Sequence, residues 1–189
     1  MPAGSTVTSD FATRPDEYTS FYQWNRTRPW PATGTVTGWN SVADNAASWT
    51  VTTPTGRGPC PTGWRLPTQA EFQALHDAGG NLAGNVGGVW VAAGTRGAAV
   101  PGRFYGPRSN ATPACSLPAD MTGCIFLPAV GYRFSGDGGH QEQSSMGYYR
   151  SSTEFNSLIG YTLNFSSTTS SPEFVSGVKA GGFNIRCVR

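Results

Sequence analysis

The segments C-P-T-G-W-R-L-P-T-Q-A-E-F, residues 60–72, and G-G-F-N-I-R-C-V-R, residues 181–189, decide the expected fold. Each carries one cysteine, and more than a hundred residues separate them in the chain. Before the second segment, residues 147–167 read G-Y-Y-R-S-S-T-E-F-N-S-L-I-G-Y-T-L-N-F-S-S, in which aromatic residues recur between small polar ones. Together these stretches predict a domain whose end folds back onto its earlier part.

Residues 69–78 carry the strong helix signal of the chain. Thr68 is a favourable N-cap, and Glu71, three residues later, completes a capping box. Phe72 and Leu75 are three residues apart and therefore share one face of the helix. The pattern predicts a short amphipathic helix with its charged residues in solvent.

Short strands are typical of the remaining sequence, so the expected fold class is α+β, with short mixed or antiparallel strands and long loops. We expect strands at 89–91, 124–134 with a break near Pro128, 148–153, 161–165 and 183–188, and a loop at 166–171. In the fourth strand, Tyr161, Leu163 and Phe165 alternate with Thr162 and Asn164, which predicts one apolar face and one polar face.

The composition excludes several classes of function. The chain has 189 residues, of which 13% are charged, and its formal net charge is +2. We find no Lys/Arg cluster, which argues against a nucleic-acid partner. No apolar run approaches the roughly 20 residues that span a bilayer, which argues against membrane insertion. The 25 glycines, 14 prolines and six tryptophans are typical of a loop-rich fold with aromatic anchors.

Four cysteines, Cys60, Cys115, Cys124 and Cys187, allow three disulfide pairings, and the sequence alone does not choose among them. A local bridge could close the short loop from Cys115 to Cys124, in which case Cys60 would pair with Cys187. Four buried, reduced thiols are the alternative. The spacings do not match a C-x-x-C zinc or redox site.

The signals for catalysis or metal binding are weak. His76 lies on the expected helix, where a surface or hydrogen-bonded histidine is the usual case. Asp137, His140 and Glu142 share one polar loop and would be the residues of a metal site, although a solvated loop is the simpler interpretation. The sequence has no nucleophile elbow and no phosphate-binding loop. We therefore expect no catalytic residues, no metal and no cofactor.

Five motifs in fixed order give the chain a family resemblance: C-P-T-G-W-R-L-P-T-Q-A-E-F, F-L-P-A-V-G-Y-R, Y-Y-R-S-S-T-E, Y-T-L-N-F and G-F-N-I-R-C-V-R. They resemble the Fibrobacter succinogenes major paralogous domain, a bacterial and phage branch of the C-type lectin-like fold. The resemblance covers roughly residues 18–189, leaving 1–17 as a lead-in. It implies a compact α+β domain and favours a Cys60–Cys187 bridge. Arg150 stands where the group typically has tryptophan.

A narrower resemblance is to the variable proteins of diversity-generating retroelements, in which mutagenesis at adenines diversifies a C-terminal stretch. This resemblance implies a ligand-binding face made of chemically mixed residues: Arg150, Glu154, Phe155, Asn156, Leu158, Ile159, Thr162, Asn164, Ser166, Thr168, Glu173 and Phe174. Rigid contact area would come from Tyr148, Tyr149 and Tyr161. Framework positions would be Ser151, Ser152, Gly160, Leu163, Phe165, Gly182 and Cys187.

Two observations set limits on that assignment. Glutamate cannot arise from an AAC or AAT codon by changes at adenine alone, so Glu154 and Glu173 do not fit simple diversification. Phe155, Leu158 and Ile159 form an apolar cluster that is either core or a solvent-facing anchor with a polar rim.

The expected function is therefore a non-enzymatic, phage-encoded protein that binds a protein or glycan receptor on a host cell surface. The expected location is a virion or a cell surface, and an oligomer within a phage tail is one possible assembly. The first alternative is a bacterial adhesin or lipoprotein domain without diversification. The second is an oxidase similar to the formylglycine-generating enzymes, although the Cys115/Cys124 pair lies in the wrong part of the chain for it.

Overall fold

The computed structural model describes residues 20–49, 52–53, 56–57, 59–78, 87–107, 109 and 114–189, with the main chain alone at 52–53, 56–57 and 171–176. The expected lead-in, residues 1–17, lies outside the described residues.

Helix α1 spans Gln69–Ala78, as predicted. Its capping box is formed: the Thr68 amide donates to Glu71 Oε2 at 2.8 Å, and the Glu71 amide donates to Thr68 Oγ1 at 3.2 Å. Phe72 is buried on the inner face, and Leu75 packs against the same cluster.

The strands are short and pair antiparallel. Two sheets have three strands: β5 (Val89–Val91), β6 (Gly102–Tyr105) and β7 (Ile125–Pro128), and β10 (Gly147–Asn156), β11 (Ile159–Phe165) and β12 (Ser170–Val178). Three sheets have two: β1 (Ser20–Phe21) with β2 (Trp30–Pro31), β3 (Thr52–Thr53) with β4 (Gly56–Arg57), and β8 (Tyr132–Arg133) with β9 (His140–Gln141). The fold is therefore α+β, with one helix among the described residues.

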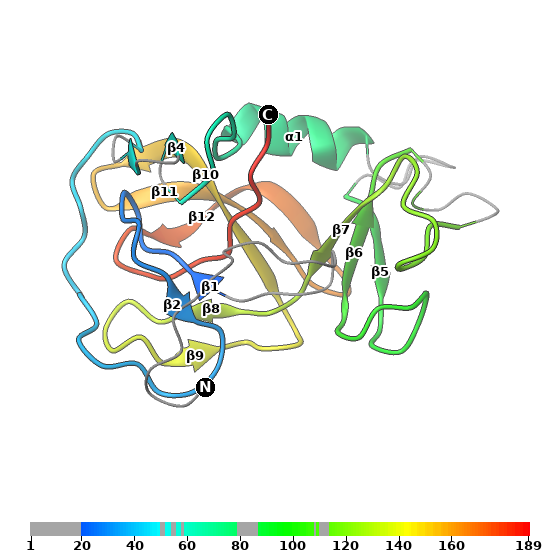
Figure 1. The fold of residues 1–189 in the computed structure, drawn as a ribbon, viewed down its shortest axis with the longest axis horizontal. Coiled ribbons are helices and arrows are strands. Elements are labelled where there is room, and N and C mark those ends of the chain that lie inside the picture. Colours follow the sequence, from blue (N-terminus) through cyan, green and yellow to red (C-terminus); the bar gives the residue numbers. More distant parts are fainter. Residues whose placement is uncertain are drawn as a thin grey trace.

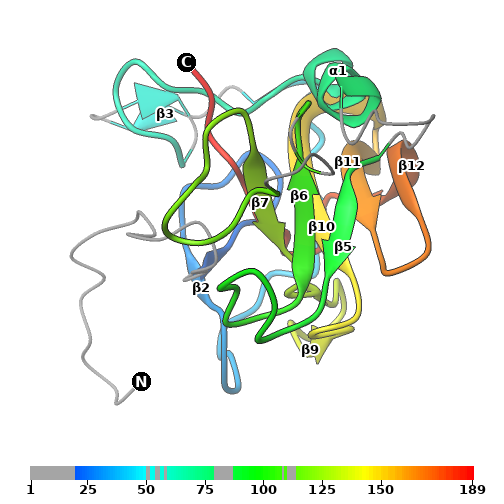
Figure 2. The ribbon, with the colours of Figure 1, turned by 90° about the vertical axis from the view of Figure 1, so that its right-hand side faces the viewer.

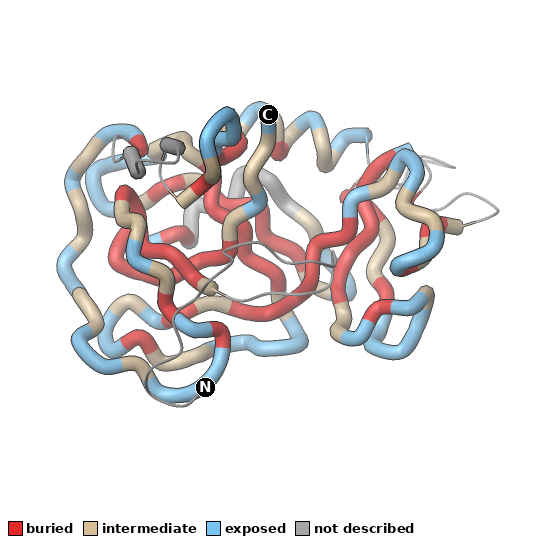
Figure 3. The backbone as a smooth tube through the Cα atoms, in the orientation of Figure 1, coloured by how far each residue is buried: buried red, intermediate tan, exposed pale blue. Residues whose placement is uncertain are grey.

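The β10–β11–β12 sheet lies at the centre of the molecule, with α1 across one end and the β5–β6–β7 sheet to one side (Figures 1 and 2). Leu163 and Phe165 of β11 are fully buried against Phe72, Tyr105 and other core side chains. Burial is concentrated along the middle of this sheet (Figure 3). The predicted apolar face of β11 is thus confirmed at these two positions.

The end of the chain folds back onto its earlier part, as predicted. Tyr22 and Phe183 exchange two main-chain hydrogen bonds of 2.9 and 3.0 Å, and Arg65 and Val188 exchange two of 2.9 and 2.8 Å. The predicted strand at 183–188 is wrong, however. Its residues form isolated bridges because they pair with different segments in turn, and no single neighbour runs alongside them.

Two disulfides show which of the three possible cysteine pairings the folded chain has. Cys60 bonds to Cys187 across 127 residues, and Cys115 bonds to Cys124 across nine. All four cysteines are therefore oxidised, and the alternative of reduced thiols is wrong. The first bridge joins the segment before α1 to the last residues of the chain.

The aromatic segment before α1 belongs to the same packed unit from residue 20 onward. Phe21, Trp24, Trp30 and Trp49 are all buried. The Trp24 and Trp49 rings pack together with centroids 5.6 Å apart. The irregular segment therefore contributes two of the hydrophobic clusters of the core.

Three arginines, Arg103, Arg133 and Arg150, are buried and donate to main-chain oxygens. Their acceptors are the carbonyls of Gly87, Gly88 and Ser166 for Arg103, of Pro31, Gly34 and Gly138 for Arg133, and of Gly177, Val178 and Gly181 for Arg150. Burial lowers the pKa of each guanidinium. Hydrogen bonds to the charged form offset the cost of removing it from water.

Candidate functional site

Among the described residues of the β10–β11–β12 sheet, the turn between β10 and β11 presents the most exposed large apolar side chains. Phe155 is 47% exposed and Leu158 is 59% exposed. Asn156 holds the turn, because its Oδ1 accepts hydrogen bonds from the amides of Leu158 at 2.9 Å and Ile159 at 3.0 Å. A side-chain acceptor of this kind satisfies turn amides that would otherwise need water. The apolar residues are thus carried on an ordered turn.

Three further residues extend this surface. The Phe155 and Tyr161 rings meet edge to face with centroids 5.5 Å apart. Ile159 is the Cα partner of Val178, which is 39% exposed at the end of β12. We define Phe155, Leu158, Ile159, Tyr161 and Val178 as the hairpin patch. For Phe155, Leu158 and Ile159, the structure favours the solvent-facing alternative over the core.

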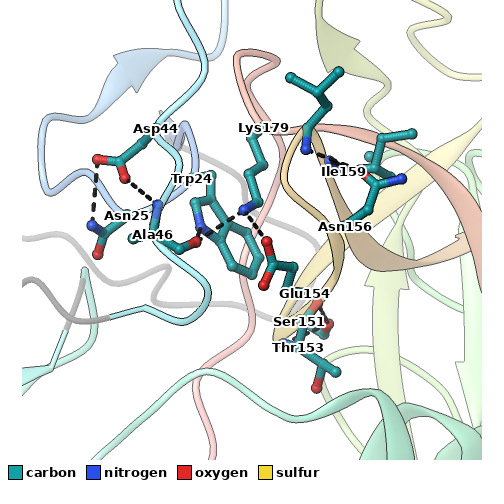
Figure 4. A network of polar contacts seen from close by, with 12 residues as sticks. Trp24, Asn25, Asp44, Ala46, Ser151, Thr153, Glu154, Asn156, Ile159 and Lys179 are labelled. Carbon is teal, nitrogen blue, oxygen red and sulfur yellow. Dashed lines mark hydrogen bonds and ion pairs between the residues drawn. The ribbon is translucent and has the colours of Figure 1, made fainter.

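A buried lysine, Lys179, lies next to the hairpin patch and contacts Glu154 (Figure 4). The Lys179 amide donates to the Leu158 carbonyl at 2.8 Å. The Lys179 side chain has no exposed surface. Its ammonium donates to Glu154 Oε1 at 2.8 Å and lies 4.9 Å from the centre of the Trp24 ring. Lys179 therefore joins the patch to the core.

The same ammonium also contacts the segment before α1. It donates to the Ala46 carbonyl at 2.9 Å, as does Trp24 Nε1. The Ala46 amide in turn donates to Asp44 Oδ1 at 2.8 Å, and Asn25 donates to the other oxygen of that carboxylate at 3.3 Å. These contacts hold Lys179, the residue after β12, against the aromatic segment before α1 (Figure 4).

A bulge in β10 sets where Glu154 lies. The β10–β11 register shifts between Arg150 and Glu154. Inside the bulge, Ser151 Oγ donates to the Tyr161 carbonyl at 3.0 Å and accepts from the Thr153 amide at 3.1 Å. Ser151 is buried, in agreement with its expected framework role. The bulge breaks strict alternation, so exposure along β10 cannot follow a period of two.

The expectation that Arg150 lies on an exposed face is wrong. Its side chain is fully buried, and the guanidinium donates to the carbonyls of Gly177 at 2.5 Å and Val178 at 2.9 Å. Burial lowers its pKa to about 9. The group lies over the Phe183 ring at 4.1 Å, which places it between β12 and the end of the chain.

Four more members of the predicted face are buried: Tyr148, Tyr149, Thr162 and Asn164. The reason is that both faces of the central part of β11 are covered: the cluster with Phe72 packs on one side, and Arg150 and Tyr148, the β10 partners of Thr162 and Asn164, are buried on the other. Tyr149 donates its hydroxyl to the Pro128 carbonyl at 3.0 Å. The prediction that these four side chains are exposed is therefore wrong.

Of the four remaining predicted residues, two lie apart from the hairpin patch. Ser166 and Thr168 occupy the β11–β12 turn at the other end of β11, where their hydroxyls are 3.2 Å apart. Glu173 and Phe174 belong to β12, but their side chains lie outside the described part. Val178 and Lys179 were not predicted, because the V-K step before the A-G-G turn gives no distinctive signal.

The loop considered for a metal is organised by its own hydrogen bonds. His140 Nε2 lies 2.7 Å from the Val130 carbonyl, and Asp137 Oδ1 accepts from the Gly139 amide at 2.7 Å. Within the described residues, no group of three His, Cys, Asp or Glu side chains is placed to hold a metal ion.

Comparison of the chain with protein-family models, curated proteins and solved structures gives no match. Among the residues with a described placement, no helix is both long enough and apolar enough to cross a membrane.

Proposed function

We propose that this chain is a non-enzymatic, C-type lectin-like domain whose hairpin patch contacts a receptor on a host cell surface. The observation that carries the proposal is the grouping of Phe155 and Leu158, on a turn held by Asn156, with Val178 at the end of β12, each 39–59% exposed. Exposed apolar groups on an ordered support are typical of the central residues of protein interfaces.

The chemistry of the cysteines supports a binding role over the oxidase alternative. That alternative requires a reactive, closely spaced cysteine pair in an exposed groove. Here Cys115 is fully buried and bonded to Cys124, and Cys60 is bonded to Cys187. Disulfides persist in oxidising surroundings, which supports a location on a virion or a cell surface.

Retroelement diversification is the setting that we favour for this domain, with a non-diversified bacterial adhesin as the alternative. Support comes from the contrast within one hairpin: residues 155–158 are exposed, whereas Leu163 and Phe165 are fully buried. The burial of Arg150, Thr162 and Asn164 restricts the proposed contact surface to the turn end of the hairpin.

Attachment of the labelled chain to a panel of intact bacterial cells tests the binding role. We expect the double variant Phe155→Ser/Leu158→Asp to lower attachment at least about tenfold, because two central apolar contacts each contribute more than about 1 kcal/mol. Val42→Asp is the control, since Val42 is 69% exposed and is not part of the hairpin patch. Unchanged attachment by the double variant, or no attachment of the parent chain to any cell, would contradict the proposal.

The genetic setting has its own test. We expect a near-copy of the DNA that encodes the tail, differing at adenines, beside a reverse-transcriptase gene. If no such copy lies in the source genome, the adhesin alternative replaces the diversified one, and the binding role is unaffected.

A further inference from the structure

A small aromatic pocket lies beside the hairpin patch, and Tyr148 is the one lining residue that the sequence predicted for the binding face. Its volume is about 130 Å³, and its lining residues are Tyr132, Phe134, Ser135, Tyr148, Val178, Gly181 and Phe183. Val178 belongs to both surfaces, so the pocket adjoins the hairpin patch. A cavity of about 150 Å³ accommodates a benzene molecule, so this pocket is large enough for one group of similar size.

Four aromatic side chains form the walls. Tyr132 and Phe183 are nearly parallel, with centroids 5.7 Å apart and an interplanar angle of 8°. Tyr148 meets Tyr132 edge to face at 5.1 Å. Phe134 is 47% exposed, whereas Phe183 is buried. The pocket therefore has a buried aromatic base and one solvent-exposed aromatic wall.

A carboxylate lies next to these rings. The Tyr148 hydroxyl donates to Glu142 Oε2. Burial chiefly, and then the charge of the same carboxylate, raise the pKa of Tyr132, so Glu142 lies near both phenols. Glu142 has φ 55° and Ser144 has φ 64°, a left-handed backbone that is uncommon outside glycine. Strained positions of this kind cluster at ligand sites.

No lysine or arginine is among the described residues that line the pocket. Three cations adjacent to lining residues are buried: Arg150 lies against Phe183, Arg133 follows Tyr132 in β8, and Lys179 follows Val178. Both guanidinium groups donate to three main-chain carbonyls, whose dipoles offset their charge. Glu142, in contrast, is exposed. The solvent-exposed charge beside the pocket is therefore the negative charge of Glu142.

We infer that the pocket binds a quaternary ammonium group of the trimethylammonium type, with the rings as walls and Glu142 as counter-charge. Aromatic faces attract cations, and cages of several rings with a nearby carboxylate recognise methylated ammonium groups. The placement of that group on a receptor rests on the proposed function. The chemistry of the pocket is testable with a free cation.

Choline and its neutral isostere 3,3-dimethylbutan-1-ol are the probes, since they share shape and differ in charge. Titration of the full chain, followed by tyrosine NMR or fluorescence, should show choline binding about 5- to 30-fold more tightly than the alcohol. Glu142→Gln should weaken choline binding at least about fivefold and leave the alcohol unaffected. Asp77→Asn, which removes an exposed carboxylate on α1, should change neither affinity.

A matched pair of variants also tests the exposed aromatic wall of the pocket. Phe134→Ala should weaken choline binding, whereas Phe155→Ala should not, although both rings are 47% exposed. Tighter or equal binding of the alcohol, absence of choline binding, or equal effects of the Glu142 and Asp77 variants would each overturn the inference. If cell attachment still depends on Phe155 and Leu158 in that case, the proposed function stands and the pocket assignment alone fails.

Discussion

The guanidinium carbon of Arg150 lies 4.1 Å from the centre of the Phe183 ring, in the interior of the fold. Its nitrogen atoms donate to three main-chain carbonyls around the β12 end. Arg150→Ala would leave these acceptors without donors and open a cavity. We expect a loss of about 3 kcal/mol or more in the free energy of unfolding, measured by urea denaturation.

Two variants sharpen this prediction. Arg150→Lys should lose less, because an ammonium retains the charge but cannot reproduce the planar fork of donors. Arg65→Ala is the control, since Arg65 forms an exposed ion pair and should cost less than about 1 kcal/mol. If the urea midpoint of Arg150→Ala equals that of the parent chain, the buried guanidinium contributes nothing to stability.

The Lys179–Glu154 pair should be energetically coupled. The lysine side chain is fully buried and the glutamate is 22% exposed, so removing Glu154 leaves an ammonium with less compensation. A double-mutant cycle of Lys179→Met and Glu154→Gln should give a coupling free energy of about 1–3 kcal/mol. A loss of stability in the double variant equal to the sum of the two single losses would disprove the coupling.

The two disulfides should differ in their contribution to stability. Cys60–Cys187 closes a loop of 127 residues and Cys115–Cys124 one of nine. On the chain-entropy model, replacing both cysteines by serine should cost about 5 kcal/mol for the first pair and about 2.5 kcal/mol for the second. Urea denaturation of the two double variants gives the comparison. A larger loss for the short loop would contradict the prediction.

Stability should also depend on pH through Glu71. Its hydrogen bonds with Arg65, chiefly, lower the pKa of Glu71 from 4.5 to about 2. The ionised form therefore stabilises the folded chain above pH 4.5, and this contribution is lost as the pH falls from 4.5 towards 2. The pair is exposed, so the effect should stay below about 1 kcal/mol.

Thermal unfolding of the parent chain and of Glu71→Gln checks this dependence. The difference in melting temperature should be constant between pH 5 and 7 and should decrease to near zero at pH 2. Arg65→Met should give the same profile. A difference that persists at pH 2 would assign the loss to the helix cap instead of the charge.

The sequence predicted best those features that local chemistry determines. Thr68 and Glu71 identify the start of α1 because the capping box is a contact within one turn of chain. Pro128 similarly identified the end of β7, since proline cannot continue a ladder of hydrogen bonds.

Features that depend on distant contacts were not predictable in this way. Thr162 and Asn164 read as an exposed polar face, but both are buried beside Arg150 and Tyr148, their partners in β10. β12 was missed because S-S-P-E-F-V-S-G-V lacks apolar alternation, and its pairing with β11 fixes it as a strand. The pocket brings Tyr132 together with Phe183, which are far apart in sequence, so no local pattern could reveal it.

The buried arginines have a consequence for how this chain can change over time. Each of the three donates to three carbonyls, and six of the nine acceptor residues are glycines: Gly34, Gly87, Gly88, Gly138, Gly177 and Gly181. A positive φ at Gly87, Gly88 and Gly138 disfavours any other residue, and a Cβ added at Gly177 would lie 2.5 Å from the Gly160 oxygen. The three cations and the glycines that accept from them are therefore constrained together.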